Sequence, residues 1–402
     1  MGINYGDNKI GKVYVGSQPI KEVYKGSDLI WQAHDFFTML MIFDENESLH
    51  RYRLKDETIE YEASEPDALN TNTWVGTGLV FGGNGNVYIT GDNEGMSIKR
   101  INAANMSDIK SISELFGSTF SYTNACFIPM EAGGQKGIVA AGTGSSDDSI
   151  KLLSTDLETE LVTFSNFDDA CSNTGAIEWG PDGYLYRGDL YGRVCRYEVY
   201  YDIFDGWQVK TTNDSFEMGD GSWGTAQITF CREPGQTFLI ACTTEGYIYR
   251  AEVSDLANTY EQVMDTSSSF GLPRGNPLAT HSLNKNHSYL TGGENDQDNN
   301  RFFQMEPDFS SIQQIIDEGM DFTPRCLAPI TVPGNIPVLF AGKEPFEDSG
   351  IALTYWDVSG HYFYNEGGDD GDEKLNALQP VHWFDVWNWE YDEDGVVTNF
   401  ND

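Results

Sequence analysis

A short run of oxygen-bearing side chains is the part of the sequence closest to a metal-binding loop. Asp296, Asp298 and Asn300 stand at alternate positions. Calcium loops arrange carboxylate and amide oxygens in this way, but they also place a glycine sixth and a glutamate twelfth. Arg301 and Pro307 occupy those two positions here. We therefore expect no resident cofactor, and we keep calcium at these three residues as the metal that the sequence allows.

Recognisable catalytic motifs are absent from the sequence. The six histidines show no H-x-H or H-E-x-x-H spacing, and the chain has neither a G-x-S-x-G nor a P-loop motif. Glycoside hydrolysis needs two placed carboxylates, but pairs of acids carry no information among 63 acidic residues. We predict that the protein is not an enzyme. The alternative is an enzyme that binds or hydrolyses glycans.

The charge balance restricts the partners. The chain has 24 basic and 63 acidic residues, for a formal net charge of −39. A field of this sign repels nucleic acid phosphates and anionic membrane surfaces. We therefore expect no nucleic acid partner. We also expect no membrane insertion, since no apolar run approaches the length of about 18 residues that a spanning helix needs.

The cysteines and the N-terminus indicate where the protein is made. The six cysteines are widely spaced and form no C-x-x-C pair, which predicts buried free thiols rather than a zinc site or a disulfide framework. The first residues, Met1 to Asn4, do not begin a signal peptide. We expect synthesis in a cytoplasm.

One apolar pattern returns along the chain, and it predicts that strands position the candidate residues. Apolar runs end near Phe43, Gly91, Gly142, Gly188, Cys242, Gly292 and Gly342. A period of about 50 residues suits a four-stranded propeller blade. We predict an all-β protein whose residues 33–402 form a β-propeller of seven blades, with eight left open by a further centre near Asp392. Helical periodicity is weak, and only Asp108 to Phe116 has a helical pattern.

The two ends of this body are expected to meet. The first blade begins at its second strand, because Phe36 to Phe43 directly follows the N-terminal segment. The run Val381 to Trp387 is predicted to supply the missing strand and close the ring, which would remove exposed sheet edges. The same region holds Trp383, Trp387 and Trp389. These side chains are expected either to pack at the closure or to form a surface for a glycan or protein partner.

A ten-residue repeat precedes the body. Val13 and Tyr14 recur as Val23 and Tyr24, each pair is followed by a Gly-Ser turn, and the second copy ends at Trp31. Short strands of β-branched and aromatic residues bury too little surface to be stable alone. Residues 1–32 are therefore predicted to be a β docking segment in which Val13, Tyr14, Val23, Tyr24 and Trp31 bind the surface of another protein.

The repeated Val-Tyr-x-Gly-Ser phrase resembles a small N-terminal module on structural proteins of tailed bacteriophages. The resemblance covers about the first 32 residues and implies a fibre-like, tail or capsid-decorating protein of the virion. Its implied partners are other virion proteins and a host-surface glycan or receptor. The alternative to docking is a plain hairpin packed on its own domain.

Overall fold

The computed structural model describes part of the chain, mostly its strands. The described residues are 4–5, 8–9, 13–15, 18–20, 22–25, 28–32, 36–43, 49–55, 58–65, 78–82, 86–90, 98–102, 106, 110–112, 115, 123–143, 149–165, 174–219, 224–233, 236–243, 245–265, 278–282, 287–292, 301–305, 309, 312–316, 324–332, 336–343, 351–357, 362–367, 375–381, 390–391 and 397–399.

Within these ranges the strands form seven four-stranded antiparallel sheets. The first four contain β10 (Gly78–Gly82), β11 (Asn86–Thr90), β12 (Ile98–Asn102) and β13 (Lys110–Ile112); β14 (Thr123–Ala132), β15 (Gln135–Thr143), β16 (Ile150–Ser154) and β17 (Glu160–Phe164); β18 (Thr174–Trp179), β19 (Leu185–Asp189), β20 (Arg193–Asp202) and β21 (Gly206–Glu217); and β22 (Thr225–Glu233), β23 (Gln236–Thr243), β24 (Tyr247–Glu252) and β25 (Glu261–Asp265). The others contain β26 (Leu278–Ser282), β27 (His287–Gly292), β28 (Arg301–Met305) and β29 (Ile312–Ile316); β30 (Pro324–Val332), β31 (Ile336–Lys343), β32 (Ile351–Asp357) and β33 (Tyr362–Gly367); and β34 (Leu375–Val381), β7 (Phe36–Phe43), β8 (Leu49–Lys55) and β9 (Thr58–Glu65).

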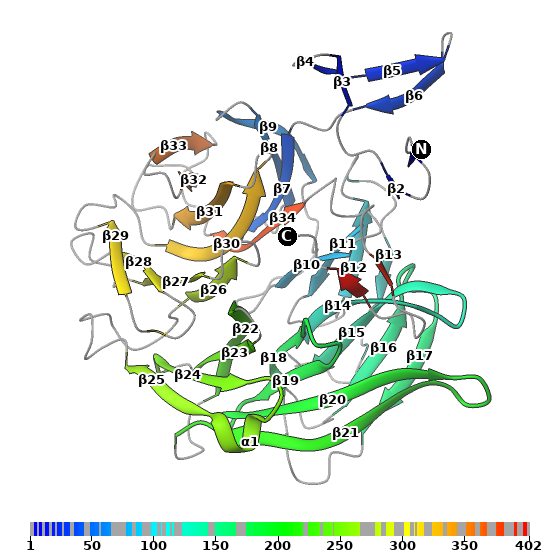
Figure 1. The fold of residues 1–402 in the computed structure, drawn as a ribbon, viewed down its shortest axis with the longest axis vertical. Helices are drawn as coiled ribbons and strands as arrows, with labels where there is room; N and C mark the ends of the chain where they lie inside the picture. The colour runs from blue at the N-terminus through cyan, green and yellow to red at the C-terminus, as the bar shows by residue number, and fades with distance from the viewer. Residues whose placement is uncertain are drawn as a thin grey trace.

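The sheets are arranged as a ring (Figure 1). The first strand of each sheet contacts the first strands of the sheets before and after it, and the cycle closes between β34 and β10. These first strands therefore form the inner wall, and later strands lie progressively further out. The prediction of an all-β, propeller-type fold is confirmed.

The strand that joins the two ends of the ring lies earlier than the sequence predicted. Leu375–Val381 pairs with β7, so that Leu378 lies opposite Met41 and Val381 opposite Thr38. The expected run, residues 381–387, lies outside the described residues apart from Val381. The prediction followed the aromatic residues of the later run, whereas the strand that the structure shows contains Pro380. Proline is tolerated there because β34 is an edge strand and one of its sides needs no ladder hydrogen bonds.

The core lies between neighbouring sheets. One cluster joins Ile128 and Ile138 of the β14–β17 sheet to Trp179 and Trp207 of the β18–β21 sheet. The second strand β11 is covered on both faces, since its Val87, Tyr88 and Ile89 are fully buried. A strand buried on both faces reads as a continuous apolar run. The repeat was visible in the sequence for this reason.

The cysteines follow the prediction in most of the described positions. Cys126, Cys231 and Cys242 are buried thiols that are not part of a disulfide. Cys195 instead forms a disulfide, which the cysteine spacing did not predict.

The predicted helical segment at Asp108 to Phe116 is wrong. Its residues 110–112 form β13, with Ile112 opposite Ile98 of β12. Pairing with an exposed strand edge overrides weak local helical periodicity in such cases. The described helix is α1 (Leu256–Thr259), a single turn between β24 and β25. No helix in the described ranges is long and apolar enough to cross a membrane.

The N-terminal repeat consists of short hairpins. β1 (Asn4–Tyr5) pairs with β2 (Asn8–Lys9), β3 (Val13–Val15) with β4 (Gln18–Ile20), and β5 (Glu22–Lys25) with β6 (Asp28–Gln32). The Gly-Ser pairs of the sequence fall between the strands of the second and third hairpins. Figure 1 shows β3–β4 and β5–β6 outside the ring of sheets. Near the other terminus, β35 (Glu390–Tyr391) pairs with β36 (Val397–Asn399).

Candidate functional site

The predicted site residues do not converge on one described site. Val13 and Tyr14 lie in β3, Val23 and Tyr24 in β5, and Trp31 in β6. The predicted partner surface (Trp383, Trp387, Trp389) and the predicted calcium ligands (Asp296, Asp298, Asn300) lie outside the described residues. In the parts of the chain that the structure describes, no group of three His, Cys, Asp or Glu side chains could hold a metal ion. Calcium binding stays a prediction.

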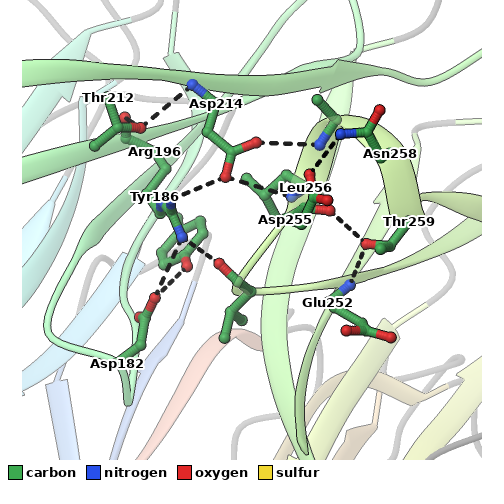
Figure 2. Close-up of polar contacts among 12 residues, drawn as sticks. Asp182, Tyr186, Arg196, Thr212, Asp214, Glu252, Asp255, Leu256, Asn258 and Thr259 are labelled. Carbon is green, nitrogen blue, oxygen red and sulfur yellow. Dashed lines mark hydrogen bonds and ion pairs between the residues drawn. The ribbon is translucent and has the colours of Figure 1, made fainter.

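A polar cluster centred on Arg196 links two neighbouring sheets (Figure 2). Nη2 of Arg196 lies 2.9 Å from Oδ2 of Asp214, and Nη1 lies 3.9 Å from Oδ2 of Asp182. Nη1 also donates to the backbone carbonyl of Val253, in the segment that follows β24 of the next sheet. The guanidinium lies 4.7 Å from the centre of the Tyr184 ring. Arg196 thus binds groups from both sheets at once.

Asp182 comes from the Pro-Asp-Gly turn that the sequence predicted between two strands. The turn joins β18 to β19, and Gly183 has a φ of +81°, which favours glycine. Tyr186 Oη donates to Asp182 Oδ2 at 2.7 Å. Burial raises the pKa of Asp182, and the hydrogen bond from Tyr186 offsets part of that rise.

Asp214 connects the same cluster to α1. Its carboxylate accepts the backbone N–H groups of Ala257 at 3.1 Å and Leu256 at 3.3 Å. Thr259 in turn accepts the N–H of Glu252 and donates to the carbonyl of Asp255. Helix-start N–H groups have no partner within the helix, so an acceptor from a neighbouring sheet fixes the position of α1.

This cluster is built for packing rather than for binding a ligand. The neighbouring pocket, lined by Arg196, Asp214 and residues beside them, has a volume of about 30 Å³. That volume holds about one water molecule. Nη1 and Nη2 of Arg196 contact protein groups, and a sugar or nucleotide does not fit in the pocket. We therefore assign the cluster to the junction between the two sheets.

Glu178 is a better chemical candidate. It lies in β18, on the inner wall of the ring, and its side chain is exposed, whereas the adjacent Ile177 and Trp179 are buried. The carboxyl reaches solvent, but the protein around it displaces much of the water. This burial raises the pKa of Glu178 to about 7. Desolvation disfavours the charged form of an acid, and at neutral pH both forms of this one are populated.

The inner strands also carry buried hydrogen-bonding atoms that lack a partner among the described residues. Thr225 Oγ1 and Gln227 Oε1 lie in β22, the first strand of the next sheet, and neither makes a hydrogen bond to the part of the chain that the structure describes. β18 and β22 contact each other directly. Buried polar atoms in native proteins usually have a partner, so water or a ligand is expected beside these two.

A cysteine nucleophile is excluded at the thiol next to Glu178. Cys126 is buried in β14, and desolvation raises the pKa of its thiol well above the usual value. The nearby Glu178 carboxylate raises it further. A thiol needs a lowered pKa to act as a nucleophile, so the Cys126 thiol is not suited to that role.

Sequence reasoning missed Glu178 because its local sequence matches no catalytic motif. The residue stands between two apolar residues in Ala176-Ile177-Glu178-Trp179. An acid within an apolar strand is a signal in principle, because it breaks the pattern without a turn. Among 63 acidic residues this signal was lost.

The fold was compared with known proteins. No protein-family model and no curated protein matches this sequence. A putative 6-phosphogluconolactonase from Bacteroides uniformis is similar in structure, with a TM-score of 0.57 and 16% identity over 87% of this chain and 100% of its own. Another from Bacteroides fragilis has a TM-score of 0.57 and 12% identity over 87% of this chain and 98% of its own. The periplasmic gluconolactonase of Pseudomonas aeruginosa has a TM-score of 0.55 and 15% identity over 85% and 99%. At these identities the likeness is one of fold.

These neighbours contradict the prediction that the chain is not an enzyme. All three are named as lactonases, so the fold itself is one that carries catalysis. The prediction relied on the absence of local motifs. In a ring of sheets, side chains that meet at the centre come from strands about 50 residues apart, and no short motif records them. The absence of a motif was therefore a poor argument.

Proposed function

We propose that this chain is a propeller enzyme that hydrolyses a sugar-derived substrate, and that Glu178 is its general base. The carrying observation is the placement of a solvent-exposed carboxyl with a pKa of about 7 on the inner wall. The fold shared with lactonases supports the same class of reaction. Among sugar-derived substrates we propose a lactone first and a glycan second.

The chemistry of lactone hydrolysis suits one titrating carboxyl. The carboxylate of Glu178 accepts a proton from a water molecule, whose oxygen attacks the ester carbonyl carbon. The ring C–O bond then breaks, and the proton passes to the departing oxygen to give a hydroxy acid. A base with a pKa near the working pH is efficient in both steps, and such groups typically contribute about 100-fold or more to the rate.

The charge of the protein favours a neutral substrate. A net charge of −39 lowers the local concentration of anions, and a phosphorylated sugar would have to approach against that field. We therefore propose an uncharged sugar lactone rather than a phosphorylated one.

The test is hydrolysis of glucono-1,5-lactone by the purified full chain, measured above the spontaneous rate. We expect Glu178→Gln to lower kcat/KM about 100-fold or more, because the amide cannot accept the proton. Glu198→Gln is the matched control, since Glu198 is an exposed acid of the same sheet that pairs with Lys210. We expect the rate of the native chain to rise with pH through about 7, the pKa of Glu178.

Two results would contradict this proposal. One is a native chain without activity on neutral lactones, phosphorylated lactones or glycans. The other is activity that Glu178→Gln leaves intact. Activity on a glycan alone would retain the enzyme and change its substrate.

A second, compatible proposal concerns the N-terminal segment. The repeat folds as separate hairpins. Each strand of these hairpins pairs with only one other strand in the described chain, so free strand edges remain available. Such edges are satisfied by adding to the sheet of another protein. We propose that residues 1–32 attach the propeller to a larger assembly, and that the virion implied by the phage resemblance is that assembly.

A further inference from the structure

The hairpin formed by β20 and β21 has an exposed apolar end. Its strands contain 10 and 12 residues, and the end of the hairpin projects from the outer side of the ring (Figure 1). At the turn, Ile203 is 79% exposed and Phe204 is 88% exposed. Two adjacent large apolar side chains held in water at a projecting turn form an anchor for another molecule. We call residues 202–205 the hairpin tip.

The backbone of the hairpin tip is fixed by its own hydrogen bonds. Oδ1 of Asp202 accepts the N–H of Phe204 at 2.7 Å and the N–H of Asp205 at 3.1 Å. Gln208 Nε2 donates to the carbonyl of Asp205 at 3.1 Å. The turn ends at Gly206, whose φ of +76° suits glycine. The apolar side chains are therefore displayed by an ordered turn, which lowers the entropy lost on binding.

The strand pair next to the hairpin tip is anchored to the body. Trp207 is buried in the core between two sheets, and its ring meets the ring of Tyr201 edge to face at 5.6 Å. Tyr201 packs on Gly133, in the β14–β15 turn of the adjacent sheet, where a Cβ atom would lie 2.4 Å from the ring. The projecting end is thus carried by a rigid support.

We propose that the hairpin tip is a docking site for a partner protein with an apolar pocket rimmed by Lys or Arg side chains. Ile203 and Phe204 fill the pocket, and the carboxylates of Asp202 and Asp205 face the rim. The hairpin tip lies on the outer side of the ring (Figure 1), whereas Glu178 lies on the inner wall. The proposed docking site is therefore separate from the proposed catalytic residue.

Charge selects this occupant over two others. A second copy of the chain would bring two bodies of −39 together and place acidic tips against acidic surfaces. An anionic lipid surface would repel the same two aspartates. A basic rim on a protein pocket instead attracts them and steers the apolar side chains inward.

The first step of the test is site-specific photocrosslinking in the cells that normally make the chain. Photoreactive benzoylphenylalanine replaces Phe204 in the full chain, and in a control it replaces Lys210. Lys210 lies on the same hairpin with 67% of its side chain exposed. We expect a protein adduct at position 204 that is absent from position 210. No adduct at 204, an adduct with the chain itself, or an adduct with lipid would each overturn the proposal.

The second step uses the crosslinked protein, purified, in a direct binding measurement. We expect Ile203→Ser with Phe204→Ser to weaken binding about tenfold or more, as for hot-spot side chains. Asp202→Asn with Asp205→Asn keeps the turn acceptor and should weaken both binding and its salt dependence. Each variant must show the melting temperature of the native chain. Binding unchanged by the serine pair would overturn the docking site, and binding unchanged by the asparagine pair would overturn the basic rim.

Discussion

Glu178 lowers the stability of the fold at neutral pH, at a position that suits the proton transfer we propose. Its neighbours in β18 contribute buried apolar surface, whereas Glu178 brings a carboxyl into an environment poor in water. The folded protein therefore holds the proton of Glu178 more tightly than the unfolded chain does. Enzymes commonly tolerate such positions because the shifted pKa serves proton transfer.

A stability measurement tests this shift without reference to activity. The usual pKa of the side chain is 4.5, and the folded value is about 7. As pH rises from 4.5 to 7, the unfolded chain ionises first, so Glu178 progressively lowers the free energy of unfolding. Glutamine does not ionise. We expect Glu178→Gln to match the native melting temperature near pH 4 and to exceed it increasingly up to pH 7, with no further gain above that. An equal difference at every pH would contradict the shift, and Glu198→Gln controls for lost charge.

Individual acids could not be assigned from the sequence, since their roles depend on neighbours far along the chain. The sequence does not distinguish Asp189 from the other acids, yet it is fully buried and accepts the N–H groups of Tyr191 and Arg193. Asp214 was not singled out, and it caps a helix from the next sheet. A carboxylate in a turn, at a sheet junction or on the inner wall looks the same in sequence.

The N-terminal hairpins are the elements whose role is most directly testable. A chain that starts at Ala33 should fold with an unchanged melting temperature but fail to join its assembly, because β1 to β6 would be missing. Residues 1–32 fused to an unrelated protein should attach on their own. Copy number in purified particles is the measurement. Full incorporation of the shortened chain would show that the segment is only a part of the propeller.

The second strands of the sheets were predictable, because continuous burial, as in β11, β19 and β23, favours a continuous apolar run. The repeat centres at Gly91, Gly142, Gly188, Gly292 and Gly342 fall at or beside the ends of β11, β15, β19, β27 and β31, the second strands of their sheets. Edge elements were less predictable. β13 and β34 each have one strand neighbour in their sheet, and neither has a strong apolar pattern. Their position is set by the edge that they cover, which local sequence does not record.

At the scale of the whole molecule, the pairing of β34 with β7 joins the two ends of the ring. A chain that stops at Lys374 lacks β34 and leaves the edge of β7 open, so we expect its melting temperature to fall by about 5 °C or more and its tendency to associate to rise. A chain that stops at Val381 keeps the strand and should melt as the full chain does. Scanning calorimetry and light scattering measure both. Equal melting temperatures for the two shortened chains would show that β34 does not hold the ring together.

The same pairing sets an order of events during synthesis. β7 is among the first strands to leave the ribosome, and β34 is made after every other strand of the ring. At translation rates of about 5–20 residues per second, tens of seconds pass between the synthesis of β7 and that of β34. During that time the nascent chain carries an unpaired edge in the sheet that it made first. A cell that makes this protein must therefore keep that edge from pairing with other chains until the last part of the message has been translated.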